Sequence, residues 1–335
     1  MHAATHVLIV AVFAAFCRAQ TPAPQQLPEL QKLLNIDAKD VATRLELIQE
    51  MLLKQDVQSN LSLFRQQYGE RVKLEPVAYA SERVQVIPGY LFSRRTIEAG
   101  KRYPALVMVH GGFHDHFDTY FFKPIAQAVE HGYIVLFPEY RGSSGYGEVH
   151  YENSYGKTDV ADVLAGAAFL SKQPNVDPDR LGIVGHSRGG MVSMLAIEQE
   201  PKRFKAAVEI AGLADFVAYM SYKPEFRRQE VAQEATFGGK LPDENLKAYV
   251  DISPINHVDA IETPLLVLAN TFDQTVPFAL HSGRMIDMLK ARGKVFDSHV
   301  YVDAPGSHMF PFANTPEAED CWRRTFDWVG RYLKP

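Results

Sequence analysis

The stretch Arg180-Leu181-Gly182-Ile183-Val184-Gly185-His186-Ser187-Arg188-Gly189-Gly190 decides the fold of this chain. Its first half is apolar and β-branched before a glycine, which is typical of a buried strand that is about to end. The mostly apolar residues 188–199 predict a helix that begins immediately. A strand, a G-x-S-x-G turn and a helix in this order predict a turn that exposes the hydroxyl of Ser187 at the top of a sheet.

Strands and helices are expected to alternate on both sides of this stretch. The predicted strands are 104–109, 133–138, 181–185, 206–210, 264–269 and 296–302. The predicted helices are 120–131, 158–172, 188–199, 277–292 and 316–333. Near-continuous apolar strands between helices predict an α/β fold, a mostly parallel, doubly wound sheet that is covered on both faces.

Three segments depart from this alternation. Residues 29–70 have the apolar spacing of two or three amphipathic helices. Residues 83–92 predict a hairpin with Pro88-Gly89 in the turn region. The long, mixed segment 213–257 predicts a helical insertion that could cover the site as a lid.

Composition and charge argue against one class of function. The chain has 335 residues, of which 46% are hydrophobic and 22% are charged, as in a globular protein with a sizeable core. The net charge of −5 and the lack of a basic stripe argue against nucleic-acid binding.

The N-terminus is predicted to be a secretory signal peptide, residues 1–19. Its apolar run, 7–16, is too short to span a bilayer, and Ala19 is a small residue suited to cleavage after it. We therefore expect a secreted or periplasmic protein without stable membrane association after cleavage, and an uncleaved anchor is the alternative. Removal of Cys17 leaves Cys321 as the single thiol, so no intramolecular disulfide is expected. The predicted division is a signal peptide at 1–19, an N-terminal helical extension at 20–79 and a catalytic domain at 80–335.

A serine hydroxyl needs a base, and that base needs a carboxylate to fix its tautomer. Asp273 follows predicted strand 264–269, and His308 follows predicted strand 296–302. The order serine, acid, histidine matches a doubly wound hydrolase. We predict Ser187, Asp273 and His308 as the catalytic residues. The alternatives are Asp215 as the acid, and His257 or His281 as the base.

The loop His110-Gly111-Gly112-Phe113 follows predicted strand 104–109, where backbone can approach a substrate closely. We predict that the backbone N–H groups of Arg188 and Gly112 form an oxyanion hole, with Phe113 as the next choice after Gly112. The side chains of His110, Phe113 and Tyr140 are expected to contact substrate.

The same loop offers a competing chemistry. His114-x-His116-x-Asp118 matches most of the H-x-H-x-D-H signature of metallo-β-lactamase-like hydrolases, but Thr119 stands where the last histidine is required. A zinc site needs three or four ligands in fixed geometry. We therefore expect neither a metal nor a cofactor, and sensitivity to chelators would indicate the alternative.

From about residue 80 to the C-terminus the chain resembles a known group, the α/β-hydrolase catalytic domain of the prolyl oligopeptidase-like serine peptidases (peptidase family S9). The resemblance rests on seven phrases: His110-Gly111-Gly112, Tyr140-Arg141-Gly142-Ser143-Ser144-Gly145-Tyr146-Gly147, Asp177-Pro178-Asp179-Arg180-Leu181-Gly182-Ile183, Gly185-His186-Ser187-Arg188-Gly189-Gly190, Ser253-Pro254-Ile255, Asp273-x-x-Val276-Pro277 and Gly306-Ser307-His308. It implies Ser187 as nucleophile, Asp273 as acid and His308 as base.

The chain also departs from that family. Members usually carry a β-propeller, whereas only about 60 residues lie between the predicted signal peptide and residue 80, too few for blades of about 40 residues each. Several members place a tyrosine hydroxyl in the oxyanion hole where this chain has His110. We expect a serine hydrolase that acts on short peptides or small esters, peptidase-like by resemblance. A carboxylesterase with the same triad is one alternative, and an inactive hydrolase scaffold that acts as a binding protein is another.

Overall fold

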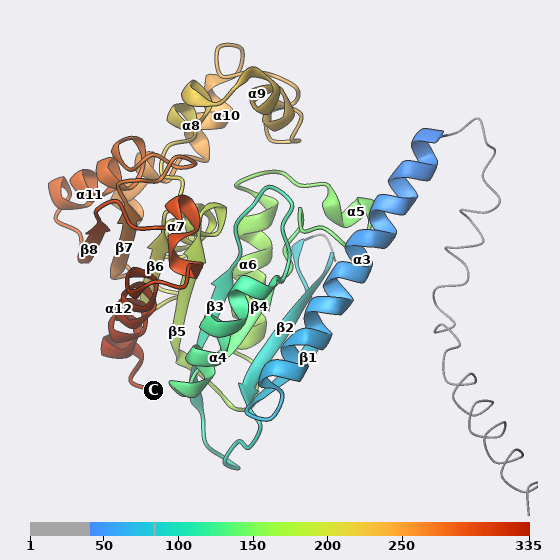
Figure 1. Ribbon diagram of the computed structural model, residues 1–335. Coiled ribbons are helices and arrows are strands. Elements are labelled where there is room, and N and C mark those ends of the chain that lie inside the picture. The colour runs from blue at the N-terminus through green and yellow to red at the C-terminus, as the bar shows by residue number, and fades with distance from the viewer. Residues whose placement is uncertain (1–40, 83–84) are drawn as a thin grey trace, which may run out of the picture. The chain divides into compact units, whose positions relative to one another are not determined.

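The computed structural model describes residues 41–82 and 85–335 (Figure 1). The predicted signal peptide, its cleavage site and the part of the predicted helical extension before residue 41 lie outside the described residues. The chain divides after Leu53 into two units, and the second, residues 54–335, contains the sheet and every site residue predicted above.

Eight strands form one sheet in the described residues, in the order β1-β2-β4-β3-β5-β6-β7-β8. Their bounds are β1 Val72–Ala80, β2 Val86–Arg94, β3 Tyr103–Val109, β4 Ile134–Pro138, β5 Val176–His186, β6 Ala206–Ile210, β7 Leu265–Asn270 and β8 Phe296–Tyr301. β1 pairs antiparallel with β2, and β2 pairs antiparallel with β4. The remaining pairs are parallel, which confirms the predicted mostly parallel sheet.

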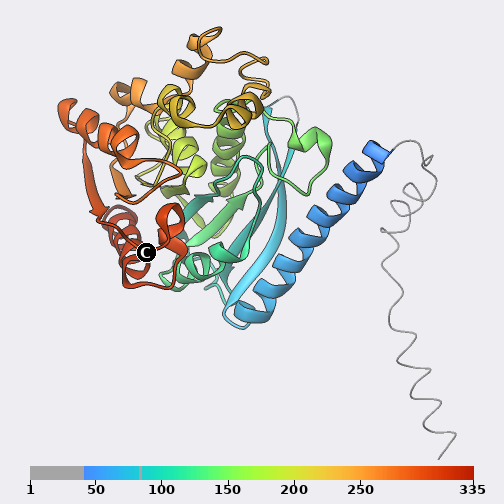
Figure 2. The same ribbon diagram turned by 45° about the horizontal axis from the view of Figure 1, so that its top comes forward.

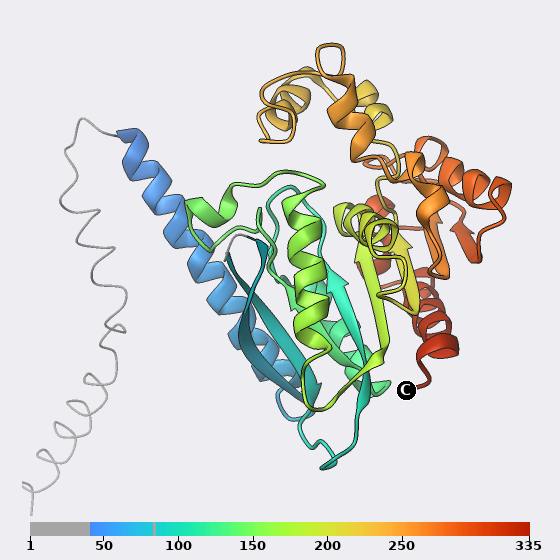
Figure 3. The same cartoon turned by 180° about the vertical axis from the view of Figure 1, so that it is seen from behind.

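Helices cover both faces of the sheet because the central strands are apolar on both sides; every residue of β4, β6 and β7 is buried. Figure 1 shows α4 Phe122–Glu130 and α12 Pro316–Leu333 in front of the sheet, and Figure 3 shows α6 Thr158–Leu170 on the opposite face. Two further helices, α7 Arg188–Gln199 and α11 Ser282–Ala291, pack in the same core layer as α6.

The shorter helices lie in the connections. They are α5 Glu148–Tyr151, α8 Phe216–Tyr222, α9 Glu225–Ala232, α10 Leu246–Asp251, η2 Thr119–Phe121, η3 Pro254–Asn256, η4 Val258–Ala260, η5 Phe278–Leu280 and η6 Ser307–Phe312. Figures 1 and 2 show α8, α9 and α10 beyond the end of the sheet where the parallel strands finish. The insertion predicted over 213–257 is therefore helical. Its role as a lid remains a prediction.

The N-terminal part of the described chain differs from expectation. One continuous helix, α3 Val41–Tyr68, replaces the predicted two or three within the described residues. Residues 72–79 of the predicted helical extension belong to strand β1, so the sheet begins before residue 80. Among residues 41–82 and 85–335, no helix combines the length and apolar character that a membrane crossing requires.

The predicted turn at Pro88-Gly89 is wrong, because both residues lie inside β2 and face Ala78 and Val77 of β1. The glycine has a different purpose there. A Cβ on Gly89 would lie 3.0 Å from the carbonyl oxygen of Phe137, so glycine permits the close approach of β4. The Pro88 carbonyl accepts a hydrogen bond from the Glu139 N–H at 3.0 Å.

Candidate active site

The turn that carries Ser187 is strained and depends on its neighbouring glycines. Ser187 lies between the end of β5 at His186 and the start of α7, with φ +59° and ψ −124°. A Cβ on Gly185 would lie 2.0 Å from the carbonyl oxygen of Gly189, and a Cβ on Gly189 would lie 2.1 Å from that of Val109. Neither position can accept a side chain. A non-glycine residue held at positive φ is typical of a site where strain serves function.

The structure brings the three predicted catalytic side chains into one hydrogen-bonded line. His308 Nε2 lies 2.8 Å from Ser187 Oγ, and His308 Nδ1 lies 2.7 Å from Asp273 Oδ2. Asp273 and His308 are buried, whereas Ser187 is half-buried. A carboxylate at Nδ1 keeps the proton on that nitrogen, so Nε2 presents a lone pair to the serine hydroxyl. The arrangement can deprotonate Ser187.

Backbone groups fix the orientation of the acid. Asp273 Oδ1 accepts hydrogen bonds from the N–H groups of Thr275 and Val276, each at 2.8 Å. This leaves Oδ2 directed at His308. The histidine is held from the other side by His186, whose Nε2 donates to the His308 carbonyl at 3.0 Å. Burial, and then the proximity of His308, lower the pKa of His186 to about 3, so its ring stays neutral.

Asn270 ties the two catalytic loops together, and the sequence analysis missed it. This buried last residue of β7 donates from Nδ2 to the carbonyls of Ala304 and Ser307, at 2.9 and 3.0 Å. Its Oδ1 accepts from the N–H groups of Ala304 and Phe272, at 3.0 and 3.2 Å. A polar residue at the end of a buried strand was the one signal available in the sequence.

We expect Asn270→Ala to lower kcat by about 10–100-fold, because the loops that carry Asp273 and His308 lose their shared anchor and a small misplacement is costly. Steady-state kinetics on a chromogenic substrate provide the measurement, with Asn256→Ala, a change at an exposed asparagine, as the matched control. A structural role alone would lower the melting temperature and leave kcat unchanged. That result would contradict the positioning role.

The alternative acid and bases lie elsewhere. Asp215 caps α8, accepting from the Ala218 N–H at 2.9 Å, and is paired with Arg284. His281 was predicted within a helix, but it separates η5 from α11 and its Nε2 lies 2.8 Å from the hydroxyl of Tyr222. His257 hydrogen-bonds to the carbonyl of Asp251 on the insertion.

The two backbone N–H groups predicted to form the oxyanion hole lie on two different elements. Arg188 is the first residue of α7, and Gly112 lies on the loop after β3 with φ +71°. In the described part of the chain, neither N–H donates to a backbone carbonyl. A Cβ on Gly111 would lie 2.9 Å from Ser187 Cβ, so the loop runs directly against the nucleophile. The N-terminal end of α7 adds a favourable dipole at this point.

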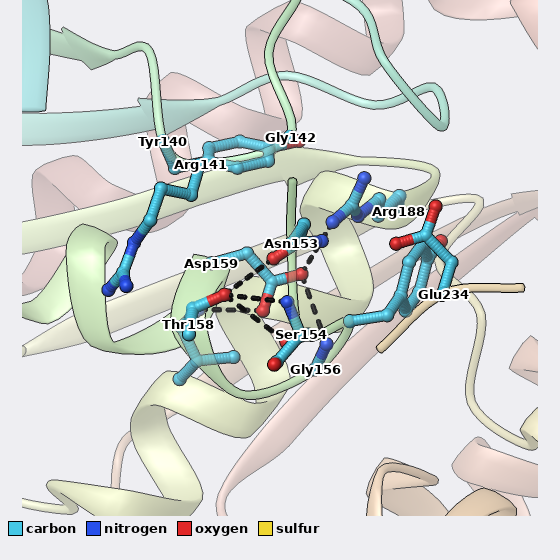
Figure 4. Close-up of polar contacts among 12 residues, drawn as sticks. Tyr140, Arg141, Gly142, Asn153, Ser154, Gly156, Thr158, Asp159, Arg188 and Glu234 are labelled. Atoms are coloured by element: carbon cyan, nitrogen blue, oxygen red, sulfur yellow. Dashed lines mark hydrogen bonds and ion pairs between the residues drawn. The ribbon is translucent and has the colours of Figure 1, made fainter. Parts of the chain in front are cut away.

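The side chain of Arg188 connects this loop to the nucleophile turn, which sequence reasoning also missed. The buried guanidinium pairs with Asp159 at 2.8 Å (Figure 4). The guanidinium donates to the carbonyl of Phe113. It also lies over the ring of Tyr155, 3.9 Å from its centroid. Asp159 in turn accepts from the N–H groups of Gly156 and Val160. A buried ion pair with these extra hydrogen bonds holds the loop in register.

Of the three predicted substrate-binding side chains, only Phe113 reaches the pocket. His110 and Tyr140 are fully buried, and their rings stack with centroids 4.2 Å apart. Tyr140 donates from its hydroxyl to the His110 carbonyl at 2.9 Å. Burial lowers the pKa of His110 to about 3, so the ring is neutral. These two side chains support the loop from beneath.

The pocket beside Ser187 has a volume of about 490 Å³. Its walls come from the loop after β3, from the nucleophile turn, from α8 and α9, and from the two catalytic loops. The size suits a small acyl group or one or two amino-acid residues.

The side chains of the metal-like signature contact separate partners. His114 Nδ1 lies 2.7 Å from the Gly142 carbonyl, whereas His116 Nε2 lies 2.9 Å from Asp56. Asp118 caps η2. Among the described residues, no group of three or more histidine, cysteine, aspartate or glutamate side chains could hold a metal ion.

Glu209 is a buried carboxyl that the sequence analysis did not single out. It lies on β6, its Oε2 accepts from the Gly212 N–H at 2.6 Å, and its Oε1 lies 3.3 Å from Ser282 Oγ. Burial raises the pKa of Glu209 from the usual 4.5 to about 7. The folded protein therefore retains a proton here between about pH 4.5 and 7 that the unfolded chain releases.

This difference predicts a pH-dependent stability. Because Glu209 binds its proton more tightly when folded, its contribution to stability is present below pH 4.5 and declines as pH rises toward 7. As pH rises from 5 to 8, the unfolding free energy of Glu209→Gln should increase by about 2–3 kcal/mol relative to that of wild type. Denaturant unfolding of both proteins across this range provides the measurement, with Glu262→Gln, at an exposed carboxyl, as the control. A constant difference across the range would contradict the raised pKa.

Comparison with known proteins settles the family. Residues 119–335 match the model of the prolyl oligopeptidase family, which is well over half of the chain. The chain belongs to the prolyl oligopeptidase family. This confirms the resemblance seen in the sequence, and it places the chain in a family of serine peptidases, which are hydrolytic enzymes.

The similar proteins include a peptidase and an acylamino-acid-releasing enzyme. The uncharacterized peptidase YuxL of Bacillus subtilis (strain 168) is 28% identical over 226 residues, which are 66% of this chain and 33% of the relative. The acylamino-acid-releasing enzyme of Arabidopsis thaliana is 30% identical over 211 residues, 61% of this chain and 27% of the relative. The chain thus spans about a third or less of the length of these relatives.

Solved structures show the same fold. A puromycin-hydrolyzing peptidase of Mycobacterium tuberculosis superposes with a TM-score of 0.68 at 24% identity, over 78% of this chain and 39% of that one. The acylaminoacyl peptidase of Pyrococcus horikoshii superposes with a TM-score of 0.68 at 23% identity, over 82% of this chain and 44% of that one. The predicted α/β-hydrolase fold is confirmed.

Proposed function

We propose that this protein is a secreted serine peptidase that cleaves short peptides through an acyl-enzyme intermediate. The observation that carries the proposal is the hydrogen-bonded line from Ser187 Oγ through His308 to Asp273, which opens on a pocket of peptide size. Membership of a serine peptidase family supports the same chemistry.

The proposed reaction has two halves. His308 Nε2 removes the proton of Ser187 as Oγ attacks the carbonyl carbon, and the N–H groups of Arg188 and Gly112 stabilise the oxyanion. The imidazolium, stabilised by Asp273, then gives this proton to the leaving amine as the C–N bond breaks. Water attacks the acyl-enzyme with His308 again as base, and the protonated histidine returns a proton to Ser187 as the acid product leaves.

A labelling and turnover experiment tests this proposal. The full chain is treated with a fluorophosphonate probe and assayed on matched pairs of fluorogenic N-acyl-aminoacyl amides and esters. We expect labelling at Ser187 and hydrolysis of both members of each pair. Hydrolysis of the esters alone would make the protein a carboxylesterase. Neither labelling nor turnover would overturn the proposal and favour a binding protein on a hydrolase scaffold.

Export is a separate part of the proposal. It rests on the apolar run and small residues before Gln20. Expression of the full chain in a secreting host should yield extracellular protein whose N-terminus is Gln20. An intact N-terminus in the membrane fraction would instead indicate an uncleaved anchor.

A further inference from the structure

The pocket beside Ser187 has two sides with different charges. On one side, ring contacts lead from Arg188 to Tyr155, then to Phe113 and on to Tyr219, with centroid separations of 5.3 and 6.4 Å between the rings. On the other side, a second series of contacts starts at the catalytic histidine. It runs from His308 through His186 and Phe312 to Tyr120 and Asp115.

The proposed mechanism assigns a role to each side. His308 must protonate the leaving group, so the leaving group lies on the histidine side. The acyl residue, whose carbonyl carbon is attacked, extends in the other direction, toward the aromatic side. The side chain of the substrate's acyl residue, which precedes the cleaved bond, therefore lies among Phe113, Tyr155 and Tyr219.

Three cations border the acyl side, and they are not equivalent. The Arg188 guanidinium is paired with the buried carboxylate of Asp159, so its charge is balanced. Arg227 lies over the ring of Phe113, 5.3 Å from its centroid, and is paired with Glu230 at 2.6 Å on the surface. The third cation on the acyl side is Lys223.

Lys223 is a half-buried ammonium without a carboxylate partner among the described residues. Its Nζ donates to the Thr275 carbonyl at 2.9 Å, and it lies 4.6 Å from the ring centroid of Tyr219. Burial, and then the charge of Arg227, lower the pKa of Lys223, and Asp273 opposes them. Two of the three N–H donors on this ammonium remain available to a ligand.

The histidine side carries a carboxylate in place of an ammonium group. Among the described residues that line the pocket, Asp115 is the one carboxylate, and it lies on this side with Tyr120 as its hydrogen-bond donor. A free C-terminal carboxylate on the leaving group would approach Asp115. An anionic group is therefore favoured on the acyl side and disfavoured on the leaving-group side.

We infer that the enzyme selects substrates whose acyl residue carries an acidic side chain, with Lys223 as the specificity-determining residue. The inference rests on the proposed function. The methylene groups of a glutamyl or aspartyl side chain would pack on Phe113 and Tyr219, and the carboxylate would reach the Lys223 ammonium. A charge in a site partly closed to water discriminates more strongly than an exposed surface charge.

The test compares isosteric substrates. N-acetyl-glutamyl and N-acetyl-glutaminyl aminomethylcoumarin amides differ in charge and hardly at all in shape, and the N-acetyl-lysyl amide carries the opposite charge. We expect wild type to have a kcat/KM for the glutamyl amide at least about tenfold above that for the glutaminyl amide. The lysyl amide should be the poorest of the three.

Variants assign the preference to one residue. Lys223→Met should reduce the glutamyl-to-glutaminyl ratio to near one, by a loss on the glutamyl amide with little change on the glutaminyl amide. Lys223→Arg should keep most of the preference. Arg228→Met is the matched control, since Arg228 neighbours Arg227 on α9, is paired with Glu225 and does not line the pocket.

Failure of this inference is separable from failure of the proposed function. Fluorophosphonate labelling of wild type and each variant verifies a folded site. Turnover with equal or lower kcat/KM for the glutamyl amide would overturn the specificity alone, as would a preference that survives Lys223→Met. Absence of both labelling and turnover would overturn the proposed function and the inference with it.

Discussion

Replacement of Ser187 by alanine is expected to lower kcat/KM by about 10⁴–10⁶-fold while the protein stays folded. The hydroxyl oxygen of Ser187 lies 2.8 Å from His308 Nε2, within hydrogen-bond distance. Its removal leaves the oxyanion donors and the pocket in place, so substrate still binds without forming an acyl-enzyme. The measurement is steady-state hydrolysis, together with loss of fluorophosphonate labelling.

The matched control is Ser221→Ala, at an exposed serine on α8 that donates to the Ala218 carbonyl. Its kinetics should equal those of wild type. If Ser187→Ala retained more than about a hundredth of the wild-type rate, another nucleophile or an activated water would have to carry the reaction. The role assigned to Ser187 would then be lost.

The parts of the fold that the sequence predicted are those set by local pattern. Strand β6 and helix α12 have the predicted bounds, because an apolar run or a 3.6-residue period is written in consecutive residues. Strand β1 was missed because residues 72–80 have a mixed burial pattern and the strand is defined by its pairing with β2, which no short stretch of sequence shows. Pro88-Gly89 has turn chemistry, yet the neighbouring strand decides its conformation.

The candidate site divides in the same way. Chain order and loop position selected Ser187, Asp273 and His308, three side chains that the fold brings into hydrogen-bond contact. Chain order and loop position could not identify the residues that hold the catalytic loops in place, Asn270 and Arg188. The hydrogen bonds of Asn270 reach residues that lie 34 and 37 positions away in the sequence. The ion pair of Arg188 joins residues that are 29 positions apart. No local pattern marks such partners, since they meet only when the strands are in register.

Asp273→Asn is expected to lower kcat/KM by about 10⁴-fold, and the hydrogen bonds of the acid give the reason. Oδ1 accepts from two backbone N–H groups, so the asparagine oxygen must occupy that position. The amide NH₂ then faces His308 Nδ1, which has to accept a hydrogen bond. This moves the imidazole proton to Nε2, where it points at Ser187 and cannot receive the serine proton.

Asp215→Asn provides the decisive contrast, because Asp215 is the alternative acid and the change is chemically identical. Asparagine is as good a helix N-cap as aspartate, so α8 keeps the bond from the Ala218 N–H. The lost pairing involves Arg284, which is 47% exposed, and costs little. We therefore expect rates within about threefold of wild type for this variant. If Asp215→Asn were the inactive variant and Asp273→Asn the active one, the acid would be Asp215. The histidine at Ser187 would then have to be oriented through a rearranged loop, contrary to the 2.7 Å contact between His308 and Asp273.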